Sequence, residues 1–255
     1  MYAFGSGVMW ATQSIDAFGN TIANPSPQQF GELQDSQIDI SRDIKELIGQ
    51  NQFAVAIGIG KGKVGIKCKF ARLNGKILDT VFSGQGYQTG TLTAINNDTT
   101  GAAIPATPFQ LTATPPGSGT YVRDLGVIDA ATGAGMDRVT GTPTTGQYVV
   151  NTTTGVYTFA LADVGKTVFI NYVYSATQAG AKSLAFQNLP MGQSPIFGVD
   201  LTVGYAGKKV VWRFPCSVSG KLTFGTKQDD FTVMDLDIAC FADTTNRIFY
   251  EYAPE

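Results

Sequence analysis

The sequence predicts a mainly β protein with one helix, in which one β domain is interrupted by a second. Charged residues make up 15% of the 255 residues, below the roughly 25% usual for soluble domains, and several segments alternate apolar and polar residues with the period of a β-strand. The composition is also uneven: residues 88–180 hold twenty Thr and eight charged residues, whereas the rest of the chain holds nine Thr and thirty charged residues. Residues 1–87 and 181–255 therefore form the predicted host domain, and residues 88–180 form the predicted insertion.

The host domain begins with strands and a rigid loop. A short apolar stretch, Gly7–Thr12, precedes Asp16–Gly31, where an Asn-Pro pair and a second proline prevent regular structure. Leu33–Ser41 and Lys63–Ala71 follow as strands. In the second of these, apolar residues alternate with lysines, which predicts a half-buried strand with a basic outer face.

One segment has helical periodicity. Within Ala71–Gly84 the apolar residues recur on one side of a 3.6-residue period, and Gly84 is placed to end the helix. Gly75 inside the segment weakens the helix by roughly 1 kcal/mol relative to Ala. We expect a helix that lies on the sheet with one apolar stripe against it: Leu73, Ile77, Leu78, Val81 and Phe82.

The insertion has its own strands. Gln147–Asn151 and Val156–Leu161 flank a Thr-Thr-Thr-Gly turn, which predicts a hairpin. Lys166–Ala176 alternates like a third strand. Short strands separated by turns at this spacing predict a small immunoglobulin-like β-sandwich.

Strands resume in the C-terminal part of the host domain. The first two of them are expected to form a meander, and Pro215 within the second marks a strand end, an edge or a bulge. The predicted ranges are Phe197–Gly207, Lys208–Ser219, Asp229–Asp243 and Arg247–Pro254.

Composition argues against several classes of active site. The chain has no His, so it cannot supply a Ser-His-Asp or Cys-His site, and the usual zinc sites lose their commonest ligand. Cys68, Cys216 and Cys240 are far apart and flanked by apolar residues, which favours buried reduced thiols. We therefore expect no metal, no cofactor and no enzymatic activity, although chemistry based on carboxylates or lysine stays open.

Charge and hydropathy narrow the partners. The formal net charge of -2 and the isoelectric point near 5.2 argue against tight nucleic-acid binding, because phosphate neutralisation needs clustered Lys and Arg. No apolar run approaches the roughly 20 residues of a membrane helix, so no membrane partner is expected.

Four local patterns have both a functional and a structural interpretation. Ala160–Thr167 nearly matches a phosphate-binding loop, but the residues after it alternate like a strand, so a turn is favoured. Gly58–Lys63 is either a basic loop that contacts a neighbour or an anion, or a solvated turn. Asp235 and Asp237 share one strand face and fit a solvated row better than a buried metal or acid–base cluster. Four aromatic residues fit core packing better than sugar stacking: Trp10, Trp212, Tyr172 and Tyr174.

The segment Asp39–Gly84 resembles the core of the major tail tube proteins of long-tailed, siphovirus-type bacteriophages. That family has a strand with a K-x-L-x-G element, a long loop, a second strand and a helix that ends near Phe-x-Gly. The matching positions are Lys45, Leu47 and Gly49, the loop Gln50–Gly62, the strand Lys63–Ala71, and the helix through Phe82 and Gly84. The opening Ala23–Asp35 and the ending Phe231–Tyr250 are also similar, and Gly146–Tyr174 resembles an immunoglobulin-like module that some members carry.

The resemblance implies a β-sandwich or barrel with a flanking helix, made in the bacterial host cytoplasm and assembled into hexameric rings. Stacked rings would form a DNA-conducting tube in the virion tail, in which open sheet edges pair between neighbours. The implied partners are further copies of the chain, the tape-measure, tail-tip and tail-terminator proteins, and genomic DNA that passes without sequence-specific binding. The candidate self-assembly residues lie in and beside the long loop: Lys45, Leu47, Gly49, Gln52, Phe53, Gly58, Gly60, Lys61 and Gly62.

Three other functions stay open. The first is another virion or secretion-tube component, such as a head decoration protein. The second is a carbohydrate-binding β module, which would need exposed aromatic side chains and would stay monomeric. The third is an enzyme, which would need a carboxylate pair held in a pocket.

Overall fold

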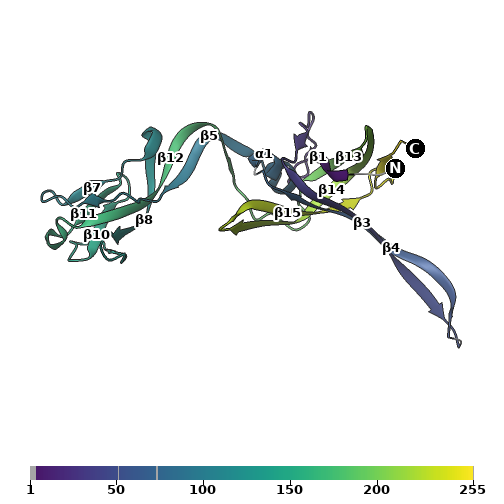
Figure 1. Cartoon of the computed structure of the whole chain (residues 1–255), viewed down its shortest axis with the longest axis horizontal. Coiled ribbons are helices and arrows are strands. Elements are labelled where there is room, and N and C mark those ends of the chain that lie inside the picture. The colour runs from purple at the N-terminus through teal and green to yellow at the C-terminus, as the bar shows by residue number, and fades with distance from the viewer. Residues whose placement is uncertain (1–3, 51, 73, 255) are drawn as a thin grey trace. The chain divides into compact units, whose positions relative to one another are not determined.

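A computed structural model describes residues 4–50, 52–72 and 74–254 of the chain (Figure 1). The protein is mainly β, as predicted, with largely antiparallel sheets and one short helical segment in the host domain. It divides into two compact units: unit 1 is Met1–Tyr87 with Leu184–Glu255, and unit 2 is Gln88–Ser183. The first boundary coincides with the predicted one, and the second lies three residues after the predicted junction between residues 180 and 181.

Unit 1 contains one long sheet. Its strand order is β2-β1-β13-β14-β15-β4-β3, and β16 pairs with β14 beside this path. The strands are β1 (Phe4–Ile15), β2 (Gln28–Gln29), β3 (Leu33–Ile48), β4 (Ala54–Phe70), β13 (Ile196–Tyr205), β14 (Lys208–Lys227), β15 (Asp230–Phe241) and β16 (Tyr250–Tyr252).

The sheet curls so that β1 comes next to β3. The Ser6 hydroxyl donates a hydrogen bond to the Leu33 carbonyl at 2.6 Å, and the Ser36 hydroxyl donates to the Ser6 carbonyl at 3.1 Å. The curled sheet encloses one apolar core, because residues of one face alternate inward along every long strand. Its fully buried members include Met9, Ile66, Phe70, Phe197, Phe214 and Leu236.

The helical segment is shorter than predicted. It consists of α1 (Gly75–Leu78) and a single π-helical turn, η1 (Asp79–Ser83), rather than a helix from Ala71. The Asn74 side chain accepts a hydrogen bond from the Lys76 amide and so fixes the start. Gly84 ends the segment in the left-handed conformation, as predicted. Within the described ranges, no helix is long and apolar enough to cross a membrane.

The apolar side of this segment covers one part of the core. Ile77, Leu78 and Val81 are buried in the core of unit 1, and the Val81 carbonyl accepts a hydrogen bond from the Ser219 hydroxyl of β14. Phe82 is partly exposed instead, and Leu73 lies outside the described residues. The predicted packing of the helix on the sheet is therefore confirmed for three of its five stripe residues.

Of the three alternatives predicted for Pro215, a strand end, an edge or a bulge, the structure shows a bulge. Between the paired positions Phe197–Ser217 and Val199–Phe214, β14 has one residue more than β13. The proline lies in that extra stretch, where its missing N–H costs no ladder hydrogen bond. Beyond the bulge β14 changes neighbour on one edge, from β16 to β15.

Unit 2 is a β-sandwich of two four-stranded sheets. One contains β5 (Tyr87–Asn96), β6 (Ala102–Ala103), β8 (Thr120–Asp129) and β12 (Thr167–Leu184). The other contains β7 (Gln110–Thr112), β9 (Asp137–Arg138), β10 (Gln147–Asn151) and β11 (Val156–Phe159), and short 3-10 turns lie at η2 (Pro116–Ser118) and η3 (Leu161–Asp163). The predicted hairpin is confirmed as β10–β11, and both sheets contribute to a second core that includes Tyr148, Tyr157, Phe159 and Val168.

Candidate self-association site

The resemblance predicted a long loop, Gln50–Gly62, with the candidate self-assembly residues in and beside it, and the prediction of a loop is wrong. Strand β3 continues to Ile48 and β4 already begins at Ala54, so most of the predicted loop is a strand. Gly58–Lys63, expected as a loop or turn, is part of the same strand. The sequence analysis assigned Gly58, Gly60 and Gly62 to a loop, but none of these glycines has a positive φ.

The ends of β3 and β4 form a two-stranded arm. Residues 41–48 pair with residues 54–63, whereas β15 pairs with β4 only between Val64 and Phe70. Figure 1 shows this hairpin running beyond the rest of the unit 1 sheet. We call residues 41–63 the arm. It holds all nine predicted site residues, with Gln52 and Phe53 at its turn; Asn51 lies outside the described residues.

One face of the arm carries an exposed apolar stripe. On β3, even-numbered residues share the face that Ile38 turns to the core, so the core-facing side of the sheet continues outward along the arm. On β4, odd-numbered residues take this face after an extra residue near Gly60. The arm stripe consists of the apolar residues of this face, Ile44, Ile48, Val55, Ile57 and Ile59, each between 66% and 69% exposed. Arg42 and Glu46 share the face, with Glu46 opposite Ile57.

Sequence reasoning missed the arm stripe. Its signal was the alternation of β-branched residues with Ala and Gly over Ala54–Gly60, which is the period of a strand. The predicted residues instead lie mostly on the opposite face or at the turn. On the opposite face Leu47 is exposed. The β4 residues of that face, Ala56 and Gly58, have little or no side chain, so β4 is nearly flat there.

The outer edge of the arm is open as well. Strand β3 is the last strand of the sheet path, and within the described ranges β4 is its one strand partner. A long unpaired edge offers a row of backbone N–H and C=O groups to another strand. The arm thus combines an unpaired edge with an uncovered apolar face.

The face of the sheet opposite the core is charged and balanced. Lys67 lies 3.6 Å from Asp39 and Lys69 lies 4.0 Å from Asp235, with all four side chains about half exposed. Asp235 is therefore solvated, as predicted, and Asp237 is half-buried beside a hollow on the same face. A hollow of about 600 Å³ on this face is lined by small and apolar residues and by the charged residues Lys63, Lys67, Lys221, Asp39 and Asp237.

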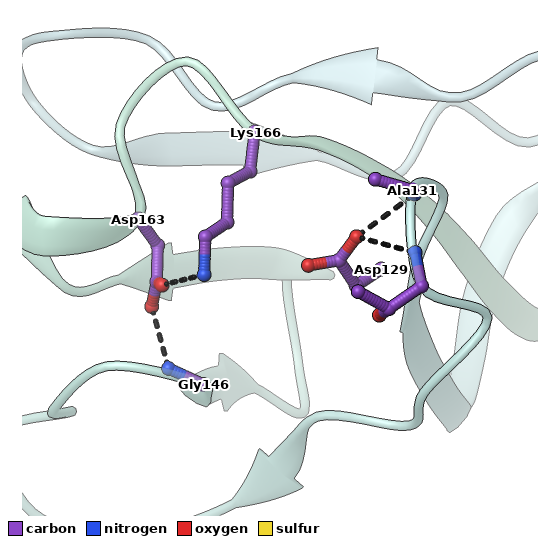
Figure 2. Close-up of polar contacts among 6 residues, drawn as sticks. Asp129, Ala131, Gly146, Asp163 and Lys166 are labelled. Carbon is purple, nitrogen blue, oxygen red and sulfur yellow. Dashed lines mark hydrogen bonds and ion pairs between the residues drawn. The ribbon is translucent and has the colours of Figure 1, made fainter.

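The segment that resembles a phosphate-binding loop is a turn, as predicted. It leads into β12, a strand, rather than into a helix whose N-terminus could face phosphate. Figure 2 shows Lys166 turned to the fully buried Asp163, with 2.7 Å between Nζ and Oδ1. Asp163 also accepts a hydrogen bond from the Gly146 amide at 2.8 Å. The hydrogen bond between Asp163 and Lys166 raises the pKa of Lys166. These groups tie two loops of unit 2 together.

The cysteines and aromatics have mainly structural places. All three thiols are free, and burial raises the pKa of Cys68 to about 12, so this thiol is protonated and unreactive at neutral pH.

Tyr172 is buried in unit 2, and Tyr174 and Trp212 pack against the cores, as predicted. Trp10 departs from the prediction, because it is 41% exposed on the outer face of β1. In the part of the chain that the structure describes, no cluster of three or more His, Cys, Asp or Glu side chains could hold a metal ion.

Comparison with known proteins adds no relative. No family model matches the chain, and a search of curated proteins finds no match to its sequence.

Proposed function

We propose that this chain is a structural subunit that assembles with copies of itself through the arm. The exposed arm stripe is the observation that carries the proposal. Five β-branched side chains, together with Ile40 at the base of the arm, leave an apolar area on the order of several hundred Å² in water, the size at which a patch on a monomer marks an interaction site. Burying each of them against a second copy contributes roughly 1–2 kcal/mol.

The arm also explains why a second copy of the chain is the expected partner. An exposed, apolar edge strand is an aggregation hazard unless it has a defined partner. Closed rings provide one, because every copy offers the same edge and receives one in return. Stacking the rings head to tail then produces a filament.

The specific assembly that we propose is the tail tube of a long-tailed bacteriophage. It rests on the resemblance of Asp39–Gly84 and on the arm, which stands where the resemblance predicts a loop and holds the candidate self-assembly residues. In this proposal hexameric rings conduct DNA in the virion tail, and tape-measure, tail-tip and tail-terminator proteins are further partners. The balanced charges of the outer sheet face agree with a protein that does not hold DNA tightly.

The proposal is tested by size measurement and microscopy. We expect the purified chain to form rings or tubes in negative stain and to scatter light as an oligomer. Ile57→Asp places a charge in the arm stripe and should shift the protein to monomers, at least a tenfold loss of association. Ile95→Asp is the matched control, because Ile95 in unit 2 is 65% exposed and Ile57 is 67% exposed. A chain that stays monomeric at every concentration, or equal behaviour of the two variants, contradicts the proposal.

A further inference from the structure

A second surface of unit 1 collects aromatic side chains. It is the outer face of β1, β13, β14 and β16, opposite the core. The strand register places Trp10, Asp200, Arg213 and Tyr250 in one row across the four strands. Tyr252 belongs to the adjacent row, beside Val211. On β1, β13 and β14 the neighbours of the row residues along each strand point to the core. The pairing thus joins residues that lie 240 positions apart in the sequence.

The tyrosines of this surface are held in a fixed orientation. The rings of Tyr250 and Tyr252 are nearly parallel, with an interplanar angle of 7° and centroids 6.2 Å apart. The guanidinium of Arg247 lies 5.2 Å from the centroid of Tyr250. Tyr252 remains 55% exposed. One end of the stack is therefore ordered by its neighbours while the other end is open to a ligand.

A hollow lies beside the two tyrosines. It measures about 350 Å³ and is lined by Arg213, Pro215, Asp243, Tyr250 and Tyr252. This volume is at the lower end of the range for small-molecule sites and accommodates one or two sugar rings. The hollow thus has two aromatic side chains on one side and charged groups beside them.

The charged groups in and beside the hollow have no net charge. Asp243 accepts hydrogen bonds from the Thr245 amide and hydroxyl and from the Arg247 amide, which lower the pKa of its carboxyl and keep it ionised. Arg213 lies 3.8 Å from Asp200, and its side chain is mostly exposed. With Arg247, the four groups sum to zero charge. A phosphorylated ligand gains little from such a set, and a purely apolar one would desolvate it at a cost.

We propose that this hollow binds a neutral oligosaccharide. One sugar ring stacks on the open side of Tyr252, where its C–H face meets the aromatic face. Its hydroxyls accept from Arg213 and donate to Asp243. Trp10 lies three strand spacings from Tyr250 along the row, about 14 Å at roughly 4.8 Å per spacing, and offers a second stacking surface to a further sugar unit. The proposal is independent of self-assembly through the arm.

Saturation-transfer NMR on the full chain tests this site, because the method works for monomers and large assemblies alike. Chitotriose, cellotriose and maltotriose are each added at about 10 mM, above the millimolar affinity expected of a small open site. At least one trisaccharide should receive saturation at its ring protons. Tyr252→Ala should weaken that binding about fivefold or more, which corresponds to one stacking contact.

The control variant is Tyr205→Ala, because Tyr205 is also a strand tyrosine and is 52% exposed. It should leave the affinity within twofold. No saturation transfer to any of the three trisaccharides overturns the proposal. So does an equal loss of binding in the two variants, which would mean that the sugar contacts exposed tyrosines without preference.

Discussion

At position 58 the arm carries a glycine that its own backbone does not require. Gly58 has no positive φ, and a Cβ built on it meets no atom within 4 Å. Glycine inside a strand costs roughly 0.5–1 kcal/mol relative to a residue with a side chain. A strand glycine of this kind often marks a place where another backbone approaches closely. In the proposed assembly, Gly58 lets a second copy reach the flat face of β4.

Gly58→Ala should therefore separate folding from assembly. We expect the melting temperature of the dispersed subunit to stay the same or rise slightly, because alanine restricts the unfolded chain more than glycine does. Self-association should weaken about tenfold, measured by light scattering across a dilution series. Gly225→Ala is the matched control, since Gly225 in β14 also has no positive φ and open space around its Cβ. Unchanged association of Gly58→Ala would show that this face of the arm stays uncovered.

Asp79 provides a pH test of the helical segment. Burial raises the pKa of its carboxyl, and the Gln85 and Gly86 amides, which donate to Oδ1, only partly oppose that shift. A raised pKa means that the folded state holds the proton more tightly than the unfolded state does. Ionisation of Asp79 therefore costs stability at neutral pH, and the cost disappears below the ordinary pKa of 3.8.

Asp79→Asn keeps an oxygen acceptor and removes the charge. We expect urea unfolding to show a more stable variant at pH 7 and no difference at pH 3, with the gain growing as the pH rises above 3.8 and constant once Asp79 is ionised in the folded state as well. A variant less stable than the parent at pH 7 would show that the two amide hydrogen bonds need the charged carboxylate.

At the scale of elements, periodicity predicted strands well and the helix only in part. Lys63–Ala71 is confirmed as a half-buried strand because its alternation of apolar residues and lysines matches the two faces of the sheet. The helix was predicted four residues too long at its start, since Asn74 acts as its N-cap and Gly75 is its first residue. Gly75 therefore sits where glycine does little harm, not in the helix interior.

The arm could not be predicted from the sequence. Alternating glycines lowered the strand propensity of Ala54–Gly62, and a monomer gives no reason for an apolar face without a cover. The register of β3 against β4 supplies what the sequence lacked, because it places Ile44 opposite Ile59 on one face. Without this register, the sequence predicted Lys45 and Gly58 as self-assembly residues and did not identify the arm stripe.

The arm should also differ from the rest of its sheet in hydrogen exchange. A two-stranded hairpin is marginally stable in water, so amides of residues 44–48 and 54–59 should exchange rapidly in the dispersed subunit. Amides of Ile66 and Leu236, in the buried part of the same sheet, should exchange slowly. Assembly should slow the arm amides at least tenfold and leave the buried ones unchanged, as followed by mass spectrometry. Slow exchange of the arm in a monomer would contradict its role as an uncovered interface.

For the whole molecule, composition predicted the division into units better than it predicted their surfaces. The low charge and high Thr content of residues 88–180 mark a segment with its own core, and the structure divides the chain within three residues of that range. The aromatic row that contains Trp10 and Tyr250 could not be read from the sequence, because it depends on the pairing of four strands. Aromatics at strand period predicted core packing, which is correct for Tyr172 and wrong for Trp10.

Two separate cores predict two unfolding transitions. Asp163→Ala removes a buried carboxylate that accepts from Gly146 and Lys166, which should cost unit 2 about 2 kcal/mol. Leu236→Ala empties part of the core of unit 1 at a cost of about 3 kcal/mol. In calorimetry of the dispersed chain, each variant should lower one transition by roughly 10 °C and leave the other in place, because neither residue belongs to the core of the other unit. A single transition that both variants lower equally would mean that the two cores unfold as one cooperative structure, and that the inserted unit depends on its host for stability.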